Sequence, residues 1–336
     1  MTKLLLYDAT VVTMNANRDQ IENGAIWIED DRIVAIGKTD ELWTQIPPDI
    51  EQVNCKGRII FPGMINTHVH TSQQLGRGLS DDVPLLVWLR ERTWPYESNM
   101  TEADSELSTL LFGLEQIRNG VTCFAESGGQ HVAGMVKATQ QLGLRGVLSR
   151  STMDEGIGLP DIWQESTDTA IEKQITLFDD YHRAADNRIR IWFSLRTIFN
   201  NSDELITRTR DIAEQHHTGI MMHIAEIREE NDYVQETRGT STVTHLNNLG
   251  VLAPNLLAAH CVWMTDDEIE LFAKHDVKVS HCPAAAMRVL GFAKIPEMID
   301  RGISVSIGTD GAPCNNRMSL IDEMWLTALI HKGRLN

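Results

Sequence analysis

Two patterns of apolar residues divide the chain. Residues 1–57 hold short apolar or β-branched runs, such as Ala25–Ile28 and Arg32–Ile36, that are separated by turn signals. These runs predict a small β-unit. In residues 58–336, short apolar runs alternate with longer amphipathic stretches, such as Glu102–Arg118, whose spacing is typical of helices. We therefore expect two domains, 1–57 and 58–336.

Eight apolar runs in the second part are predicted to be strands. They are Ile59–Ile65, Val121–Ala125, Gly146–Ser149, Ile189–Leu195, Ile220–Ile224, Leu256–Ala259, Val277–Ser280 and Ile303–Ile307. Strands that alternate with helices indicate parallel strands joined by helical crossovers. Eight such units predict an α/β fold of the (β/α)8 TIM-like barrel type, which typically takes about 250 residues. An open doubly wound sheet is the alternative, but no Gly-rich phosphate loop follows the first run.

Histidines and carboxylates stand at the ends of these runs, where a barrel carries its chemistry. His68 and His70 follow the first run, His223 lies at the end of the fifth, and Asp310 follows the eighth. Residues i and i+2 of a strand point the same way, so His68 and His70 can face the interior together. Three imidazoles and one carboxylate predict a site for one divalent metal, with Zn²⁺ favoured and Fe²⁺ or Mn²⁺ as alternatives.

Neighbouring polar groups suit hydrolytic chemistry. A bound metal lowers the pKa of a water ligand to about 7, which makes hydroxide available at neutral pH. Glu226 is expected to shuttle a proton, and Asp310 could also accept the proton of the water. His260, after the sixth run, is expected to hold that water or to stabilise developing charge. The fourth run ends with Arg196 and holds no lysine to bridge two metals, so we favour a mononuclear site.

Composition narrows the function classes further. The formal net charge is −17, and such a surface repels phosphate backbones and anionic lipid, so we expect no nucleic-acid and no membrane partner. The short apolar run at the N-terminus predicts no signal peptide. The five cysteines lack C-x-x-C spacing, which disfavours a disulfide framework or a structural zinc cluster. We expect a cytoplasmic protein.

These motifs resemble those of the amidohydrolase superfamily, in its mononuclear aminohydrolase branch. Residues 62–70 are similar to the family pattern P-G-(F/L/M)-(I/V)-(D/N)-x-H-x-H. The later family motifs match, in order, His223-x-x-Glu226, Ala259-His260-Cys261, Ser280-His281-Cys282-Pro283 and Gly308-Thr309-Asp310-Gly311. The resemblance covers essentially the whole chain. It implies that the N-terminal unit belongs to a composite β-sandwich, and that the protein could form a homo-oligomer.

Within the superfamily, the sequence is most similar to S-adenosylhomocysteine/5′-methylthioadenosine deaminases, with guanine deaminases and s-triazine hydrolases close to them. Residues 86–97 look like the adenosine-type substrate segment, in which Glu97 would meet a ribose hydroxyl. Arg150 resembles a substrate-side arginine. Arg196 stands where the adenosine type has a histidine, and it is closer to the arginine that guanine deaminases use for their base. Because a guanidinium only donates hydrogen bonds, it suits a ring oxygen or a carboxylate better than the edge of adenine.

The combined features predict an enzyme that hydrolytically deaminates an amino-substituted nitrogen heterocycle, with an adenosine-type substrate favoured. A guanine or pterin deaminase and an s-triazine hydrolase are the alternatives, and a catalytically inactive metal-binding barrel is the alternative from another class. The retained catalytic candidates Glu226, His260 and Asp310 disfavour the inactive barrel, because a scaffold needs no proton shuttle. The small heterocyclic substrate is expected to contact Glu97, Arg150, Arg196, Glu226 and His260.

The length of the chain departs from the family pattern. The sequence stops at Asn336, shortly after Asp322–His331, which reads as the start of the closing barrel helix. The resemblance implies strands that return to the N-terminal unit, so we expect a chain truncated at its C-terminus. Without those strands, the β-unit is expected to expose strand edges and apolar surface.

Overall fold

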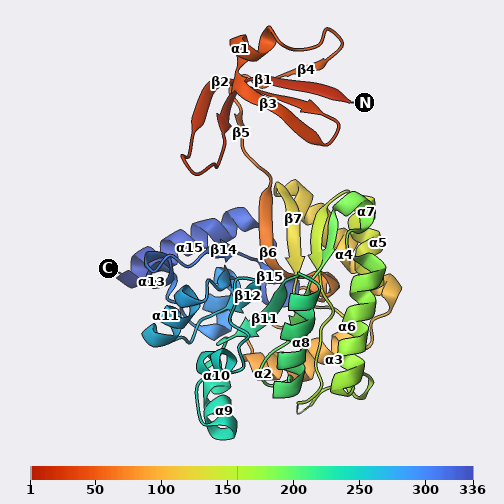
Figure 1. Cartoon of the computed structure of the whole chain (residues 1–336), viewed down its shortest axis with the longest axis vertical. Helices are drawn as coiled ribbons and strands as arrows, with labels where there is room; N and C mark the ends of the chain where they lie inside the picture. The colour runs from red at the N-terminus through yellow and green to blue at the C-terminus, as the bar shows by residue number, and fades with distance from the viewer. Residues whose placement is uncertain (1, 157, 336) are drawn as a thin grey trace. The chain divides into compact units, whose positions relative to one another are not determined.

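The computed structural model describes residues 2–156 and 158–335 of the chain. Two compact units make up the chain, Met1–Gly63 and Met64–Asn336 (Figure 1). The division lies after residue 57, because the two-residue strand Ile59–Ile60 pairs with the first strand of the N-terminal unit.

The first unit is a five-stranded sheet with one short helix. Its elements are β1 (Lys3–Val12), β2 (Gln20–Glu29), β3 (Arg32–Lys38), α1 (Thr39–Trp43), β4 (Glu51–Asn54) and β5 (Ile59–Ile60). The strand order is β3-β2-β1-β4, and β5 pairs beside β4 along β1. One small core is formed by Leu5, Ala25, Leu42 and Ile50. The edge strand β3 leaves Ile33, Val34 and Ile36 exposed, which makes it a surface suited to pairing with another strand.

The second unit is a mixed α/β structure with parallel strands. Its strands are β6 (Met64–His70), β7 (Val121–Glu126), β8 (Arg145–Leu148), β9 (Ile189–Ile191), β10 (Phe193–Leu195), β11 (Ile220–Ile224), β12 (Leu256–His260), β13 (Lys278–His281), β14 (Val305–Ile307) and β15 (Asp310–Gly311). They form two sheets, β15-β6-β7-β8-β9 and β10-β11-β12-β13-β14. Trp192 alone separates β9 from β10, and Gly308 and Thr309 separate β14 from β15, so the chain passes from one sheet to the other at these two points. This order is that of a (β/α)8 barrel, and the predicted fold class is confirmed.

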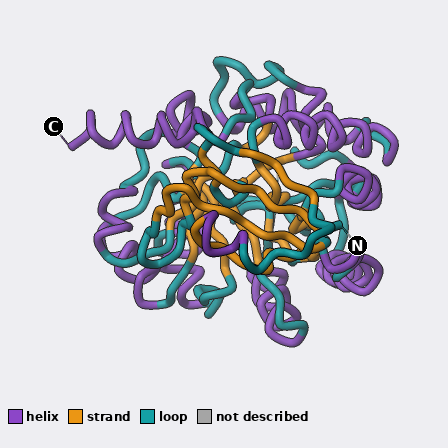
Figure 2. Tube along the Cα trace, turned by 90° about the horizontal axis from the view of Figure 1, so that it is seen from above, coloured by secondary structure: helices purple, strands orange, loops and turns teal. Residues whose placement is uncertain are grey.

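Helices of the second unit connect its strands. Figure 2 shows the helices of the chain in purple and its strands in orange. The longer ones are α4 (Glu102–Arg118), α5 (Val132–Leu142), α6 (Thr167–Tyr181), α8 (Asp203–Gln215), α9 (Arg228–Arg238), α10 (Thr242–Asn248), α11 (Asp266–Lys274) and α15 (Leu320–Leu335). Shorter ones are η1 (Thr71–Gly76), α2 (Leu85–Val87), η2 (Trp88–Thr93), α3 (Trp94–Ser98), η3 (Asp161–Trp163), α7 (Ala184–Asn187), α12 (Pro283–Ala285), η4 (Ala286–Leu290), α13 (Ile295–Asp300) and α14 (Ala312–Asn315). None of the described helices has both the length and the apolar character needed to cross a membrane.

Apolar side chains from the strands and the inner helix faces form the main core of the second unit. On α8, the buried apolar positions are Leu205, Ile206, Ile212 and Ala213, at the spacing of one helix face. This face packs on strands whose own apolar residues, such as Phe193 and Ile220, are almost fully buried. A close-packed core of this kind holds the carboxyl ends of the strands in fixed positions.

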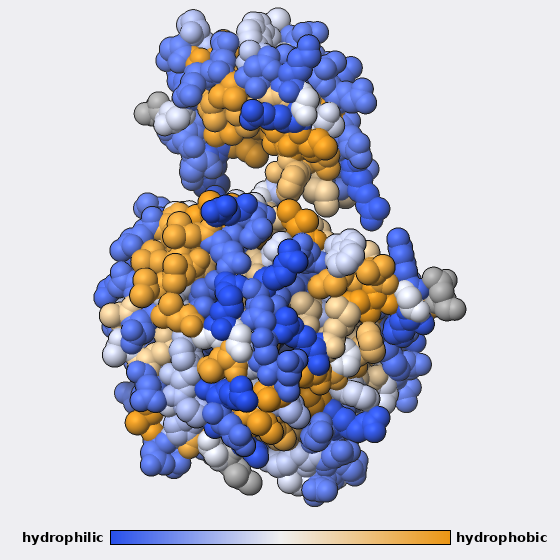
Figure 3. Space-filling model, turned by 180° about the vertical axis from the view of Figure 1, so that it is seen from behind, coloured by the Kyte–Doolittle hydropathy of each residue, from blue (hydrophilic) through white to orange (hydrophobic). Residues whose placement is uncertain are grey.

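Some apolar side chains of the second unit remain at its surface, as the orange areas of Figure 3 show. On α4, the large exposed apolar residues are Leu107, Leu111, Leu114 and Ile117. On α15, they include Ile321, Met324, Trp325 and Leu329. Spacings of three and four residues place each set mainly on one face of its helix. Contiguous apolar faces of this kind are typical of surfaces that contact other protein.

Candidate metal centre

The four predicted metal ligands meet at the carboxyl ends of the strands. His68 and His70 lie at the end of β6, His223 lies in β11, and Asp310 opens β15. All four side chains are buried. Ligand atoms of His68, His70 and Asp310 lie within 4.8 Å of one another, and so do those of His68, His223 and His260. The structure therefore brings the four predicted ligands together and places His260 beside them.

The imidazole nitrogens of the cluster face a common centre. The Nε2 atoms of His70 and His223 lie 3.2 Å apart. Asp310 Oδ1 lies 3.5 Å from His68 Nε2 and 3.6 Å from His70 Nε2. Within the described residues, His68 Nε2 has no hydrogen-bond partner. Buried polar atoms normally have a partner, so an unpartnered imidazole nitrogen among other converging imidazole nitrogens fits a bound cation.

Contacts behind the cluster fix the orientation of two imidazoles. His223 Nδ1 lies 2.8 Å from the backbone oxygen of Arg196, so it donates a proton there and leaves the Nε2 lone pair free. His68 Nδ1 lies 2.5 Å from Ser127 Oγ. Burial, followed by the charge of Arg196, lowers the pKa values of His70 and His223 well below their ordinary value. Both rings are therefore neutral at physiological pH, which is the form that binds a metal.

Two carboxylates of the site differ in protonation. Burial raises the pKa of Asp310, but the neighbouring imidazoles, first that of His68, outweigh burial and hold this pKa well below its usual range. Burial, and then the charges of Asp310 and Glu230, raises the pKa of Glu226 well above its usual range. Glu226 Oε1 lies 3.6 Å from His260 Nε2. An ionised carboxylate beside a protonated one is an arrangement suited to acid–base catalysis.

Backbone conformation at the site is also unusual. His260 has a φ of 69° and Asp310 a φ of 62°, in the left-handed region that residues other than glycine rarely adopt. Such conformations cost free energy and cluster at functional sites. Here both strained residues belong to the metal cluster or contact it. The donor set of three imidazole nitrogens and one carboxylate oxygen fits a divalent cation of the zinc type.

A small cavity of about 20 Å³ reaches the cluster. Its lining consists of His70, Gln73, Leu85, Trp88, Leu89, Arg196, Thr197, His223, Glu226, His260 and Asp310. A space of this size holds about one water molecule. Most of its apolar lining comes from α2 and η2, the segment that follows β6 and η1. This segment therefore covers the site, and η2 is a π-helical turn of the kind that is frequent at functional sites.

Arg196 brings a buried positive charge to this cavity. The residue is 5% exposed, and its Nη1 lies 3.4 Å from His70 Nδ1. Its guanidinium forms no ion pair with the carboxylates of residues 2–156 and 158–335. A buried cation without a carboxylate partner is costly. The site is therefore suited to a ligand that accepts hydrogen bonds from Arg196.

The other two predicted substrate residues lie in different surroundings. Glu97 is buried, and its Oε1 accepts hydrogen bonds from Ser72 Oγ at 3.2 Å and Gln73 Nε2 at 3.1 Å. Burial raises the pKa of Glu97. Arg150 lies elsewhere, because its guanidinium pairs with Glu165 at 2.5 Å and lines a separate cavity. Glu97 thus contacts Gln73, which lines the cavity at the metal cluster, whereas Arg150 does not belong to the lining of that cavity.

Glu126, which ends β7, is a further residue of the site that is not among the predicted ones. Its Oε2 accepts a hydrogen bond from the backbone N–H of Thr71. Its Oε1 lies 3.9 Å from His70 Nδ1 and has no hydrogen-bond partner among the described residues. Burial raises the pKa of this carboxyl to about 7. The signal that identified the histidines, a polar residue at the end of a strand, also applies to Glu126.

A second supporting glutamate is Glu230 in α9. Its carboxylate accepts hydrogen bonds from the backbone N–H groups of Ala225 at 2.8 Å and Glu226 at 3.0 Å. Ala225 has a φ of 50°, so the carboxylate holds a strained turn directly after β11. Glu230 thereby fixes the backbone of Glu226. Its neighbour Glu229 is exposed, and the sequence alone does not indicate which of these two glutamates supports the site.

Comparison with known proteins places this geometry in a family. The amidohydrolase family model matches residues 59–336. The chain belongs to the amidohydrolase family. A relative in this family, 5′-deoxyadenosine deaminase of Methanosarcina mazei, is 34% identical over 335 residues, which cover 99% of this chain and 74% of that protein.

Two further relatives of this amidohydrolase extend the comparison. The 5-methylthioadenosine/S-adenosylhomocysteine deaminase of Pelotomaculum thermopropionicum is 31% identical over 335 residues, 99% of this chain and 75% of that protein. The crystal structure of an adenosine deaminase from Xanthomonas campestris with bound zinc has a TM-score of 0.88 and 25% identity. That match covers 100% of this chain and 75% of the other. The predicted family is confirmed, and the relatives are deaminases.

Proposed function

We propose that this chain is a metal-dependent hydrolytic deaminase that acts on an adenosine-type nucleoside and releases ammonia. The observation that carries this proposal is the convergence of His68, His70, His223 and Asp310 on one buried centre, next to Glu226 and His260. The similarity to deaminases of 5′-deoxyadenosine and of 5-methylthioadenosine supports the substrate class.

In this proposal, the three imidazoles and Asp310 hold one divalent cation. Zn²⁺ is the favoured ion because this donor set suits it, with Fe²⁺ and Mn²⁺ as alternatives. A cation bound there lowers the pKa of a water ligand to about 7, which supplies a nucleophile near neutral pH. Asp310 is ionised, and therefore able to accept a proton from that nucleophile.

Glu226 and His260 act on the heterocycle. Hydrolysis of the exocyclic C–N bond needs a proton on the ring nitrogen beside the reacting carbon and another on the leaving amino group. Glu226 holds a proton because burial raises its pKa, and it delivers that proton to the ring. Burial lowers the pKa of His260 to about 3, so this residue is neutral and stabilises developing charge as a hydrogen-bond donor. Asp310 passes the proton that it took from water to the amino group, and ammonia leaves as the C–N bond breaks. The hydroxyl on the ring carbon then returns a proton to Glu226 as the carbonyl forms.

The remaining polar residues would orient the substrate. Glu97 would accept a hydrogen bond from a ribose hydroxyl. Trp88 and Leu89 would pack against the ring, because they form the apolar lining of the cavity. For Arg150, whose guanidinium pairs with Glu165, a direct substrate contact would require this pair to open.

A second candidate substrate class rests on Arg196. Its guanidinium is buried without a carboxylate partner among the described residues, and it offers only donors to the cavity. A heterocycle that carries a ring oxygen, such as guanine or a pterin, satisfies those donors better than the edge of adenine does. The same metal, Glu226 and His260 would serve that reaction.

Ammonia release from a panel of heterocycles tests the proposal. The panel contains 5′-deoxyadenosine, 5′-methylthioadenosine, S-adenosylhomocysteine, guanine, a pterin and an amino-triazine, each given to the zinc-loaded protein. We expect the highest kcat/KM with an adenosine-type nucleoside. Preference for guanine or the pterin would support the second candidate. Metal binding without turnover of any compound would overturn the assignment and favour a non-catalytic barrel.

A further inference from the structure

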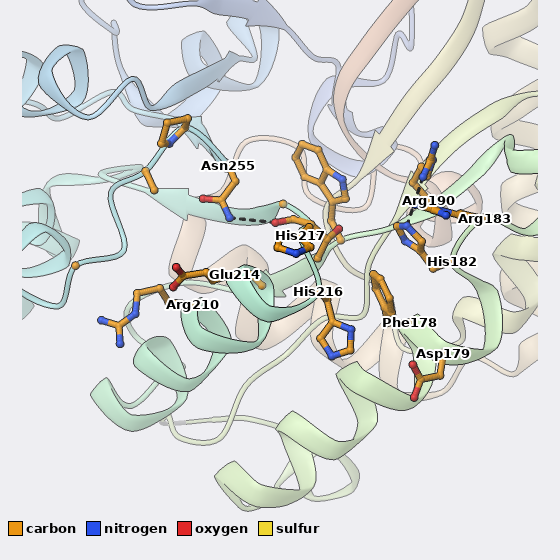
Figure 4. Close-up of a pocket in the computed structure, with 17 residues that line it drawn as sticks. Phe178, Asp179, His182, Arg183, Arg190, Arg210, Glu214, His216, His217 and Asn255 are labelled. Carbon is orange, nitrogen blue, oxygen red and sulfur yellow. Dashed lines mark hydrogen bonds between the residues drawn. The ribbon is translucent and has the colours of Figure 1, made fainter.

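A second, much larger cavity lies at the opposite end of the barrel strands from the metal cluster. Its volume is about 1090 Å³. Its lining includes Gly219, directly before β11, and Asn255, directly before β12, whereas His223 and His260 belong to the carboxyl-terminal parts of these strands. The cavity also takes in the last turns of α6 and α8 (Figure 4). No step of the proposed deamination uses it.

One wall of this cavity offers flat aromatic surface. Trp192 lies so close to the backbone of Gly219 that a Cβ atom there would come within 2.4 Å of the indole. Glycine is therefore required for the indole to occupy this position. Nearby, the Phe178 ring stacks on His182 with ring centroids 4.1 Å apart, and it lies 4.7 Å from His216. Stacked surfaces of this kind bind planar rings.

Two arginines lie together at one end of the cavity. Arg183 and Arg190 lie at the same end in Figure 4, next to His182. Arg190 Nη1 donates to His182 Nε2 at 3.5 Å. Neither arginine forms an ion pair in the part of the chain that the structure describes. With 47 acidic residues against 30 basic ones, this chain has carboxylates in excess, so two arginines left unpaired at one cavity are available for another anion.

The other charged groups of the lining do not neutralise this end. Arg210 and Glu214 lie at the far end in Figure 4, and Arg210 pairs with Asp211 at 2.6 Å. Asp179 lies on the other side of Phe178 from the two arginines in that view. His216 and His217 add aromatic rings to the lining. Positive charge and aromatic surface therefore meet within one cavity.

We propose that this cavity binds a small aromatic anion. Its phosphate or carboxylate lies at Arg183 and Arg190, whose planar guanidinium groups match both kinds of oxyanion. Its ring lies against Trp192 and Phe178. The volume is ample for one small ligand, because typical sites enclose about 300–1,000 Å³. The site is separate from the metal centre and holds its ligand whether or not the metal is bound.

Four probes separate the contributions of ring and charge. Phenyl phosphate and benzoate carry both features, inorganic phosphate carries only charge, and benzyl alcohol carries only the ring. Binding is followed by calorimetry and by tryptophan fluorescence. We expect saturable millimolar or tighter binding of phenyl phosphate or benzoate, with the preferred one identifying the head group, and weaker binding of the two partial probes. Failure of both aromatic anions to bind saturably would overturn the proposal.

Variants then locate the binding site. Arg183→Gln combined with Arg190→Gln is expected to weaken binding at least about tenfold, because each guanidinium supplies charge-assisted hydrogen bonds. Arg183→Gln alone, at an exposed position, is expected to weaken it in the same direction. The matched control is Arg208→Gln, since Arg208 pairs with Asp168 and Glu204 outside the cavity and should leave binding unchanged. Trp192→Phe should remove the fluorescence response. Native affinity in a double variant that unfolds at the normal temperature would contradict the proposed site.

Discussion

Glu226 combines burial, a raised pKa and a neighbouring imidazole, His260, whose Nε2 lies 3.6 Å away. Replacing Glu226 by glutamine keeps its shape and removes its transferable proton. The four metal ligands are untouched by this change. We expect Glu226→Gln to bind metal as the native protein does and to lose about 100-fold or more of its kcat. Metal content and ammonia release, measured on the same preparation, check both expectations. Full activity in this variant would refute the assigned role.

Glu126 is expected to position His70. A histidine that binds a metal through Nε2 normally donates its Nδ1 proton to an acceptor, and Glu126 Oε1 is a free acceptor 3.9 Å from that atom. Glu126→Gln should therefore weaken metal affinity about 10- to 100-fold. A competition titration with a chelator measures this change. Unchanged affinity would show that Glu126 does not support His70.

Glu126→Gln, which is expected to weaken metal binding, should stabilise the metal-free protein at alkaline pH. Burial raises the pKa of Glu126 from 4.5 to about 7, so the native state holds its proton longer than the unfolded state does. Stability is therefore lost as pH rises from about 4.5 through 7, and it is unaffected below that window. We expect Glu126→Gln to raise the free energy of unfolding by roughly 1–3 kcal/mol at pH 8 and to leave it unchanged at pH 4. Urea denaturation of metal-free protein at both pH values tests this.

The ligands were predictable at the residue scale, and their supports were predictable only in part. His68 and His70 stand two apart in a strand, so their common direction follows from strand geometry. Glu230 accepts a hydrogen bond from the backbone N–H of Glu226 across a turn in which Ala225 has a positive φ. No local sequence pattern predicts this turn. His281 also ends a strand, yet its Nε2 lies 3.5 Å from His331 Nε2 of α15, outside the metal cluster. Only the three-dimensional packing separates these cases.

At the scale of elements, α2 and η2 cover a cavity of about 20 Å³ that is too small for a nucleoside. Substrate entry therefore requires residues 85–93 to move. We expect amide hydrogens of this segment to exchange faster than those of β6 in the free protein, and to slow when a nucleoside occupies the Glu226→Gln variant. Hydrogen exchange measured by mass spectrometry tests this, with α8 as the segment that should not change. Equal exchange of residues 85–93 with and without nucleoside would contradict it.

Elements with strong local signals were predictable from the sequence. The helix expected at Glu102–Arg118 is α4, which Thr101 and Asp104 begin with a capping box. Seven of the eight apolar runs correspond to barrel strands, with β9 and β10 dividing one of them at Trp192. The run predicted at Ile59–Ile65 is wrong as a single strand, because Ile59–Ile60 is β5, which pairs with β1 of the first unit, and β6 begins only at Met64. The sequence pattern does not predict the individual elements from η1 to α3, because these short helical turns lack a sustained apolar period. Its position over the site depends on long-range packing.

At the scale of the whole molecule, the exposed apolar face of α4 predicts self-association. Leu107 and Leu114 are 50% and 54% exposed, and family resemblance implies a homo-oligomer. We expect the native protein to sediment as an oligomer at micromolar concentration, and the variant with Leu107→Lys and Leu114→Lys to dissociate. Gln141→Lys on α5 adds charge without removing apolar surface and should leave association unchanged. A native protein that remains monomeric at all concentrations would contradict this prediction.

The proposed deamination depends most on a single divalent metal at His68, His70, His223 and Asp310. The direct measurement is ammonia release from 5′-deoxyadenosine while metal-free protein is titrated with Zn²⁺. We expect no release at the start, a linear rise, and a plateau at one equivalent of metal. Full activity before any metal is added, or a plateau only at two equivalents, would contradict it.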